Sequence, residues 1–240
     1  MSTASSFRSD CPHSQLAIRT LYACQVAKSA AAAAAVGIAT GSKSSLDSIG
    51  RLEKQLDELD MEIDDGVTSA ITQVTESVAR ELLACMKIMI GLERIGDLLL
   101  SFGYSAAQVG ARIEPQDVRD LTQMASILEK MLADLGDGFS QRDVQKAIGV
   151  LRADAEMDRL RNLIFLRHIE NPENVPRQES LQVIFMTQSL ERAGDHAKNV
   201  AEEVCHFVSG RPVRHVLMTS DEPLEQLLIS WLRERDHKRA

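Results

Sequence analysis

Hydrophobic and polar residues alternate along most of this chain with the period of amphipathic helices. The period is clearest late in the sequence, over residues 183–208. One stripe of this segment is apolar: Val183, Met186, Leu190, Ala197, Ala201, Val204 and Val208. The opposite stripe is polar: Gln188, Glu191, Asp195, Asn199, Glu202 and His206. The segment therefore predicts a helix with one face for the core and another that carries a row of oxygen donors.

The same period predicts five further helices upstream. These five helices cover about 13–40, 46–66, 75–103, 115–136 and 140–170, and the second continues weakly towards 75. The sixth helix, described above, begins just beyond 176. Gly103 and Gly136 are expected to end the third and fourth helices, and Ser44 or Ser45 to cap the second. Three helices, a short linker and three more helices predict an all-α protein built from two three-helix bundles.

The two halves look like copies of each other. Leu92-Glu93-Arg94-Ile95-Gly96-Asp97 recurs 98 residues later as Leu190-Glu191-Arg192-Ala193-Gly194-Asp195, and the apolar positions around both match. We therefore expect an internal duplication, with one repeat at 12–108 and the second at 113–210. Residues 211–240 are expected to form a tail with a short amphipathic helix over 221–235.

Each half also contains a second acidic pair on the helix before the repeated motif. Asp60 and Asp64 in the first half correspond to Asp154 and Asp158 in the second, and the members of each pair are four residues apart. Carboxylates at this spacing lie one turn apart on one helix face and repel each other unless a positive charge lies between them. If neighbouring helices run antiparallel, both acidic pairs of a half meet, and their oxygens suit hard metal ions.

Taken alone, the periodicity favours a solvated acidic face over a metal site, because exposed helix faces are commonly acidic. The duplication and a family resemblance favour the metal site. Leu-Glu-Arg-x-Gly-Asp, continued as His-x-x-Asn-x-Ala-Glu to Glu202, resembles the carboxylate signature of the PhoU family, bacterial regulators of phosphate uptake. Residues 210–215, Gly-Arg-Pro-Val-Arg-His, are similar to that family's ending, so the resemblance spans about 12–215.

The PhoU resemblance implies multinuclear metal clusters of iron or zinc, with magnesium or manganese as alternatives. Matching positions give the candidate ligands of the second half: Glu191, Asp195, Asn199, Glu202, Asp154 and Asp158. The first half has Ser101 and Tyr104 where the second has Asn199 and Glu202. Its candidates are Glu93, Asp97, Asp60 and Asp64, and we expect this site to be weaker, smaller or empty.

Other residues near the motifs have simpler interpretations. Arg94 and Arg192 are expected to form ion pairs at the bundle edge or to donate hydrogen bonds to the carboxylates. Gly96 and Gly194 lie towards the apolar side, where a missing side chain allows close helix packing. Glu203-x-x-His206 fits a di-iron pattern, so His206 is a further candidate ligand.

Charge and cysteine usage limit the function classes. The formal net charge is −8, which does not favour nucleic-acid binding. The four cysteines form no Cys-x-x-Cys pair, which suggests reduced thiols in the cytoplasm. The alanine run at 30–35 is flanked by Lys28 and Lys43, so we expect a packed helix and no membrane insertion. The sequence contains no phosphate loop, nucleophile elbow or zinc-type cysteine spacing, so no motif indicates an enzyme.

The resemblance implies a non-enzymatic cytoplasmic regulator of phosphate uptake and starvation signalling. Its implied partners are the ATPase subunit of a phosphate ABC transporter and a sensor histidine kinase, and family members commonly form homodimers. Two alternatives stay open: a ferritin-like carboxylate oxidase or storage protein, and a metal-free helical adaptor.

Overall fold

The structure is a computed structural model that describes residues 12–170 and 177–210. Within these ranges it contains six α-helices, two short 3-10 turns and no strand. The helices are α1 (Pro12–Thr40), α2 (Lys43–Ala70), α3 (Glu76–Val109), α4 (Pro115–Gln141), α5 (Val144–Glu170) and α6 (Arg177–Ser209). The tail expected at 211–240, with its helix over 221–235, lies outside the described residues, and so does the α5–α6 connection.

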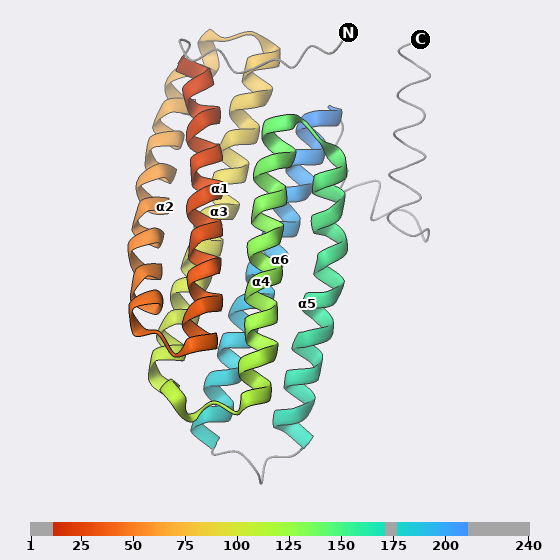
Figure 1. The fold of residues 1–240 in the computed structure, drawn as a ribbon. Helices are drawn as coiled ribbons and strands as arrows, with labels where there is room; N and C mark the ends of the chain where they lie inside the picture. Colours follow the sequence, from red (N-terminus) through yellow and green to blue (C-terminus); the bar gives the residue numbers. More distant parts are fainter. Residues whose placement is uncertain (1–11, 171–176, 211–240) are drawn as a thin grey trace.

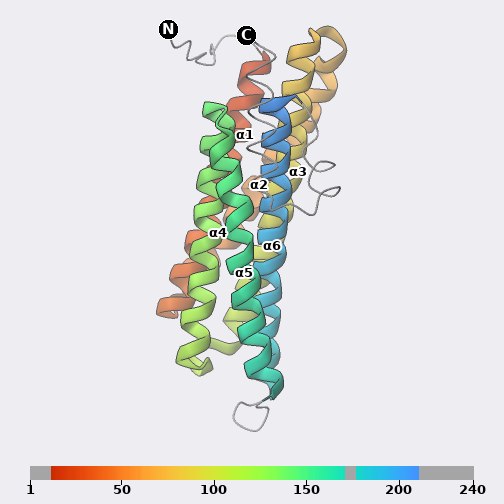
Figure 2. The same ribbon diagram turned by 90° about the vertical axis from the view of Figure 1, so that its right-hand side faces the viewer.

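Helices α1–α3 form one antiparallel bundle and α4–α6 form a second, as the sequence predicts. The bundles meet along two helix pairs, α1 with α4 and α3 with α6 (Figure 1). Seen after a quarter turn, all six helices run along one long axis, and α3 and α6 still lie side by side (Figure 2). Buried residues of both bundles join into one continuous hydrophobic core. The duplicated halves therefore fold as one unit.

Helix α1 occupies the centre of the assembly because its side chains are small. Ala27, Ala30, Ala31 and Ala34 are fully buried, and α1 contacts α2, α3 and α4. Its segment Ser14–Thr40 is long and apolar enough to cross a membrane by length and composition alone, a test that buried core helices of soluble proteins also pass. That segment is 56% buried inside the protein, as a central core helix is expected to be.

Several helix ends differ from the sequence-based expectation. Helix α3 continues through Gly103 to Val109, and Gly103 is buried mid-helix, where a Cβ would lie 3.4 Å from the Ile49 side chain. Helix α4 continues through Gly136 and Gly138 and ends at Gln141, and its C-cap residue Arg142 takes a left-handed conformation with φ 53°. These glycines permit close helix approach and do not stop the helices.

Two helix starts also differ from the sequence-based expectation. Ser42 caps α2 by accepting a hydrogen bond from the Ser45 amide at 3.3 Å, so neither Ser44 nor Ser45 is the N-cap. The positive φ of the preceding Gly41 turns the chain early enough for Ser42 to take this role. Helix α5 begins at Val144, after the Asp143 side chain accepts a hydrogen bond from Gln145.

The base of the second bundle holds a buried ionic network that the periodicity did not indicate. Arg167 of α5 bridges Asp117 and Asp120 of α4. His168 lies 3.0 Å from Asp117 through Nε2 and 3.1 Å from the Ser180 hydroxyl through Nδ1. The network ties together the start of α4, the end of α5 and the start of α6.

Candidate metal centres

The first acidic cluster lies between α2 and α3. These helices run antiparallel, since Gly96 of α3 packs against Leu56 of α2 and Gly103 against Ile49. Burial first, and then the neighbouring Asp97, raise the pKa of Glu93. Burial and the adjacent Asp64 likewise raise the pKa of Asp60. Asp60 also contributes to the raised pKa of Glu93, so the two helices bring Asp60, Glu93 and Asp97 together, whereas Asp64 acts only on Asp60 of its own helix.

Two further carboxylates belong to this cluster and were not identified from the sequence. The pKa of Glu53 is raised by burial, then by Asp57 and by Asp97 across the helix pair. Asp57 also contributes to the raised pKa of Asp60 and Glu93. The signal was present in the spacing, because acidic residues 53, 57, 60 and 64 repeat at intervals of four, three and four along one face of α2.

The second acidic cluster lies between α5 and α6. Burial and the neighbouring Asp195 raise the pKa of Glu191, with Asp158 and Asp154 of α5 adding to the effect. Burial and Asp154 raise the pKa of Asp195. The two aspartates of α5 and the two acidic residues of α6 thus face each other across the helix pair.

Basic side chains already compensate much of the charge in this second cluster. Lys198 Nζ lies 2.5 Å from Asp154, whose carboxylate is nearly buried. Arg161 lies 3.6 Å from Glu191 and 3.7 Å from Asp158. The first cluster has only Arg94 in this role among the ion pairs of the described residues, at 3.4 Å from Glu93 and 3.7 Å from Asp97.

Asn199 and Glu202 lie on a different side of α6. Both line a groove between α6 and α3, with Lys87 and Ile90 on its far wall. The carboxylates of α5 lie across the other side of α6. The second-half candidates are therefore divided between two places, which removes the reason for expecting the first site to be the poorer one.

The chemistry of both clusters suits a hard cation. Raised carboxylate pKa values record negative charge that the protein leaves incompletely compensated, and a divalent ion relieves such repulsion. Across residues 12–170 and 177–210, however, no group of three or more His, Cys, Asp or Glu side chains converges on one point. The donor types fit a metal, and closing them around an ion requires side-chain rearrangement, including displacement of Lys198 in the second cluster.

The motif glycines hold the paired helices close together. A Cβ on Gly96 would lie 2.7 Å from Leu56, and a Cβ on Gly194 would lie 3.3 Å from Met157. The packing role expected for both is confirmed. Arg94 forms the expected bundle-edge ion pairs, whereas Arg192 has no ion pair in the described part of the chain.

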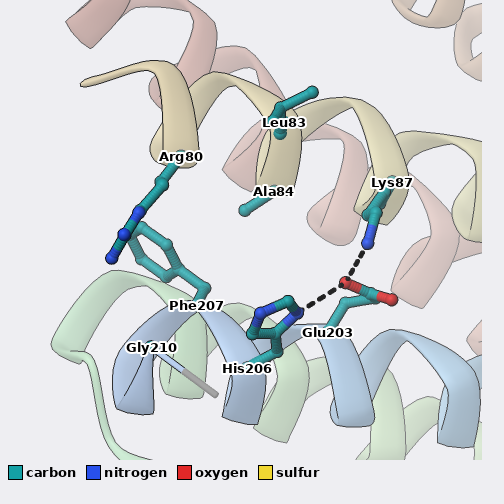
Figure 3. Close-up of a pocket in the computed structure, with 8 residues that line it drawn as sticks. All are labelled: Arg80, Leu83, Ala84, Lys87, Glu203, His206, Phe207 and Gly210. Carbon is teal, nitrogen blue, oxygen red and sulfur yellow. Dashed lines mark hydrogen bonds and ion pairs between the residues drawn. The ribbon is translucent and has the colours of Figure 1, made fainter. Parts of the chain in front are cut away.

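His206 lies away from both carboxylate clusters. It lines a pocket at the end of the α3–α6 groove, where Glu203 of α6 is approached by His206 of the same helix and by Lys87 of α3 (Figure 3). Lys87 is 2.9 Å and His206 3.7 Å from the Glu203 carboxylate. The Glu203-x-x-His206 pair is thus an ion-pair network with Lys87, and it does not add His206 to the metal ligands.

Both repeats match the same family model, the PhoU domain, over residues 23–104 and 121–204. The chain belongs to the PhoU family. It is 33% identical over 179 residues to the Phosphate-specific transport system accessory protein PhoU homolog of Pseudomonas aeruginosa, covering 72% of this chain and 71% of that protein. The homolog of Pseudomonas putida is 31% identical over 176 residues, covering 70% and 68%.

Solved PhoU structures share the fold. The crystal structure of PhoU from Pseudomonas aeruginosa superposes with a TM-score of 0.77 at 23% identity, covering 85% of this chain and all of that one. PhoU from Streptococcus pneumoniae gives a TM-score of 0.76 at 20% identity, with 83% and 96% covered. The all-α tandem architecture and the family assignment made from the carboxylate motif are both confirmed.

Proposed function

We propose that this chain is a non-enzymatic, cytoplasmic regulator of phosphate uptake and of phosphate-starvation signalling. The observation that carries the proposal is that both repeats match the PhoU domain. Relatives at 31–33% identity are named as accessory proteins of the phosphate-specific transport system. The partners we propose are the ATPase subunit of a phosphate ABC transporter and a sensor histidine kinase, which the chain contacts as a homodimer.

Docking on these partners is the proposed mode of action. A helical unit with one continuous core is rigid enough to favour one of two states of a partner, provided that it binds them with different affinity. Cations held by the cluster of Glu93, Asp97, Asp60 and Asp64 would tie α2 to α3. Those held by Glu191, Asp195, Asp154 and Asp158 would tie α5 to α6. The ions would supply positive charge between the facing carboxylates and so stiffen the docking surface.

A metal-free adaptor is the second candidate. It is favoured by Lys198 and Arg161, which already compensate the second cluster without a metal. Elemental analysis of gently purified protein separates the two candidates. Stoichiometric metal and a lower melting temperature after chelation support the metal-stiffened regulator, whereas neither effect supports the adaptor. Iron-dependent oxygen consumption would contradict both and support a ferritin-like oxidase.

The decisive experiment for the regulatory role is co-purification of the full chain from phosphate-replete cells. We expect the transporter ATPase and the kinase to be enriched over a control pull-down with an unrelated helical bundle of similar charge. Deletion of the gene should raise phosphate uptake when phosphate is ample. Absence of both partners, together with unchanged uptake in the deletion strain, would falsify the proposal.

A further inference from the structure

The pairing of α3 with α6 places the two copies of the repeated motif in matching surroundings. The helices run antiparallel, because Gly91 of α3 contacts Val200 of α6 while Gln108 of α3 accepts a hydrogen bond from Gln182. Since α6 repeats α3 at an interval of 98 residues and the two helices are antiparallel, an approximate twofold axis between them exchanges each residue of α3 with its equivalent in α6. Positions on one half of the α3–α6 groove therefore have counterparts on the other half.

Two hollows in this groove are related in that way. The first is about 210 Å³ and includes Lys87, Ile90, Gly91, Asn199 and Glu203 in its lining. The second is about 230 Å³ and is lined by Phe185, Gln188, Ser189, Ser101, Ser105 and Arg192. Adding or subtracting 98 converts the five named residues of the first hollow into the first five of the second, in that order. Arg192 likewise corresponds to Arg94.

Three of the replacements between these twin hollows make the lining less acidic or richer in neutral donors. Glu203 becomes Ser105, Ile90 becomes Gln188 and Gly91 becomes Ser189. These three changes remove a carboxylate from the lining and add a hydroxyl or amide donor at each position, whereas the change from Lys87 to Phe185 removes the ammonium group that is paired with that carboxylate. In the first hollow the Glu203 carboxylate is paired with Lys87, whereas the described residues that line the second include no carboxylate.

The donors of the second hollow are also unused. Ser105, Gln188, Ser189 and Arg192 make no side-chain hydrogen bond or ion pair with any described residue. Of the neighbouring carboxylates along the helices, Asp97 pairs with Arg94 and Glu191 with Arg161, and Asp195 forms no ion pair with Arg192 in the described part of the chain. The Arg192 guanidinium and three neutral donors thus face one open space with no acceptor of their own.

We propose that this hollow, which we call the α3–α6 donor pocket, binds inorganic phosphate. A guanidinium provides paired N–H donors that match the oxygens of a tetrahedral oxyanion, and charge-assisted hydrogen bonds of this kind are the strong ones. The hydroxyls of Ser105 and Ser189 and the amide of Gln188 supply further donors around the same anion. The choice of phosphate among oxyanions rests on the proposed function, and would make the chain a direct sensor of the ion whose uptake it regulates.

Calorimetric titration of the full chain with inorganic phosphate tests the proposal, with chloride at matched ionic strength as the blank. Arg192→Gln is expected to weaken phosphate binding about tenfold or more, the effect of losing a charge-assisted contact. Arg94→Gln is the matched control because it removes the equivalent arginine of the other repeat, and it should leave binding unchanged. Ser105→Glu with Ser189→Gly rebuilds the lining of the twin hollow and should abolish binding.

Each alternative result has a defined meaning. No phosphate binding at millimolar concentration, or equal loss in Arg94→Gln and Arg192→Gln, overturns the proposal. Binding of phenyl phosphate without binding of free phosphate also overturns it, because the pocket would then recognise a phosphorylated group. A chain that captures the transporter but does not bind phosphate loses this inference and keeps the proposed function. A chain that binds phosphate but captures neither partner keeps this inference and loses the proposed function.

Discussion

Gly91 of α3 packs directly against Val200 of α6, so closely that a Cβ at Gly91 would lie 2.3 Å from the Val200 Cγ2 atom. Val200 is almost fully buried, and a β-branched side chain has few rotamers into which it can retreat. This contact sets the separation of the two helices that join the bundles. It also positions the groove that holds the donor pocket and its twin.

Gly91→Ala is therefore expected to destabilise the protein. Alanine gains about 1 kcal/mol over glycine in a helix, but overpacking a buried contact costs about 1–3 kcal/mol. We expect a net loss of about 1 kcal/mol in the free energy of unfolding, measured by urea denaturation. Gly149→Ala on α5 is the control, since no atom beyond its own helical backbone lies within 4 Å of the position that a Cβ would take, and it should be stabilising. Stabilisation by both substitutions would show that α3 and α6 can separate freely.

The buried network at the base of the second bundle leads to a second prediction. Asp117 is 1% exposed and receives hydrogen bonds from Arg167 and His168. Removing one partner of a buried ion pair leaves the other charge uncompensated and costs about 3–5 kcal/mol. Asp117→Asn should lower the free energy of unfolding by about 3 kcal/mol. This value lies near the low end of that range because Arg167 retains its ion pair with Asp120.

Glu156→Gln is the comparison for that measurement. Glu156 pairs with Arg159 one helical turn away, and both side chains are more than a third exposed. An exposed pair of this kind contributes little to stability, because water screens it, so Glu156→Gln should leave the free energy of unfolding almost unchanged. A similar loss of stability in Asp117→Asn and Glu156→Gln would mean that the buried network does not hold the helix ends together.

The sequence predicted the helices and the duplication because both depend on local spacing. Leu82, Ile88 and Leu92 of α3 are fully buried, as the 3.6-residue period required. Gly103 and Gly136 were misjudged because a glycine that ends a helix and one that lets a neighbouring helix approach look identical in sequence. Whether a glycine allows close helix packing depends on side chains of other helices, here Ile49 for Gly103 and Cys24 for Gly136.

The site was predictable in part for the same reason. Facing acidic pairs followed from i and i+4 spacing and antiparallel packing. Glu53 and Asp57 were missed because the duplication repeats only the pair Asp60 and Asp64, and the second half has no acidic equivalents of the other two. The Asp117–His168 contact joins residues 51 positions apart, so no local pattern indicates it.

The two carboxylate clusters are expected to differ in metal content. The sequence favoured the second cluster because of Asn199 and Glu202, but these side chains line the groove towards α3. The first cluster gains Glu53 and Asp57, while Lys198 and Arg161 compensate the second. Glu93→Gln with Asp97→Asn should therefore remove more metal than Glu191→Gln with Asp195→Asn, measured by elemental analysis. A larger loss from the second pair would restore the expectation drawn from the sequence.

The dependence of stability on pH provides the last test. Burial and neighbouring carboxylates raise the pKa of Glu191 above 4.5 and that of Asp195 above 3.8. Because these groups bind protons more readily in the folded protein, they disfavour folding once ionised. In metal-free buffer, the free energy of unfolding should rise as the pH falls from neutral through the raised pKa values towards the ordinary ones, 4.5 for Glu and 3.8 for Asp.

Below that range the trend should reverse. Burial alone would raise the pKa of Asp117, but the hydrogen bonds from His168 and Arg167 outweigh it and hold the pKa below 3.8. This contribution to stability is present above the ordinary pKa and is lost as the pH falls through the lowered one. Glu191→Gln with Asp195→Asn should flatten the rise in stability on mild acidification and leave the loss at lower pH unchanged. An unaltered profile in that variant would show that the carboxylates of the second cluster do not repel one another in solution.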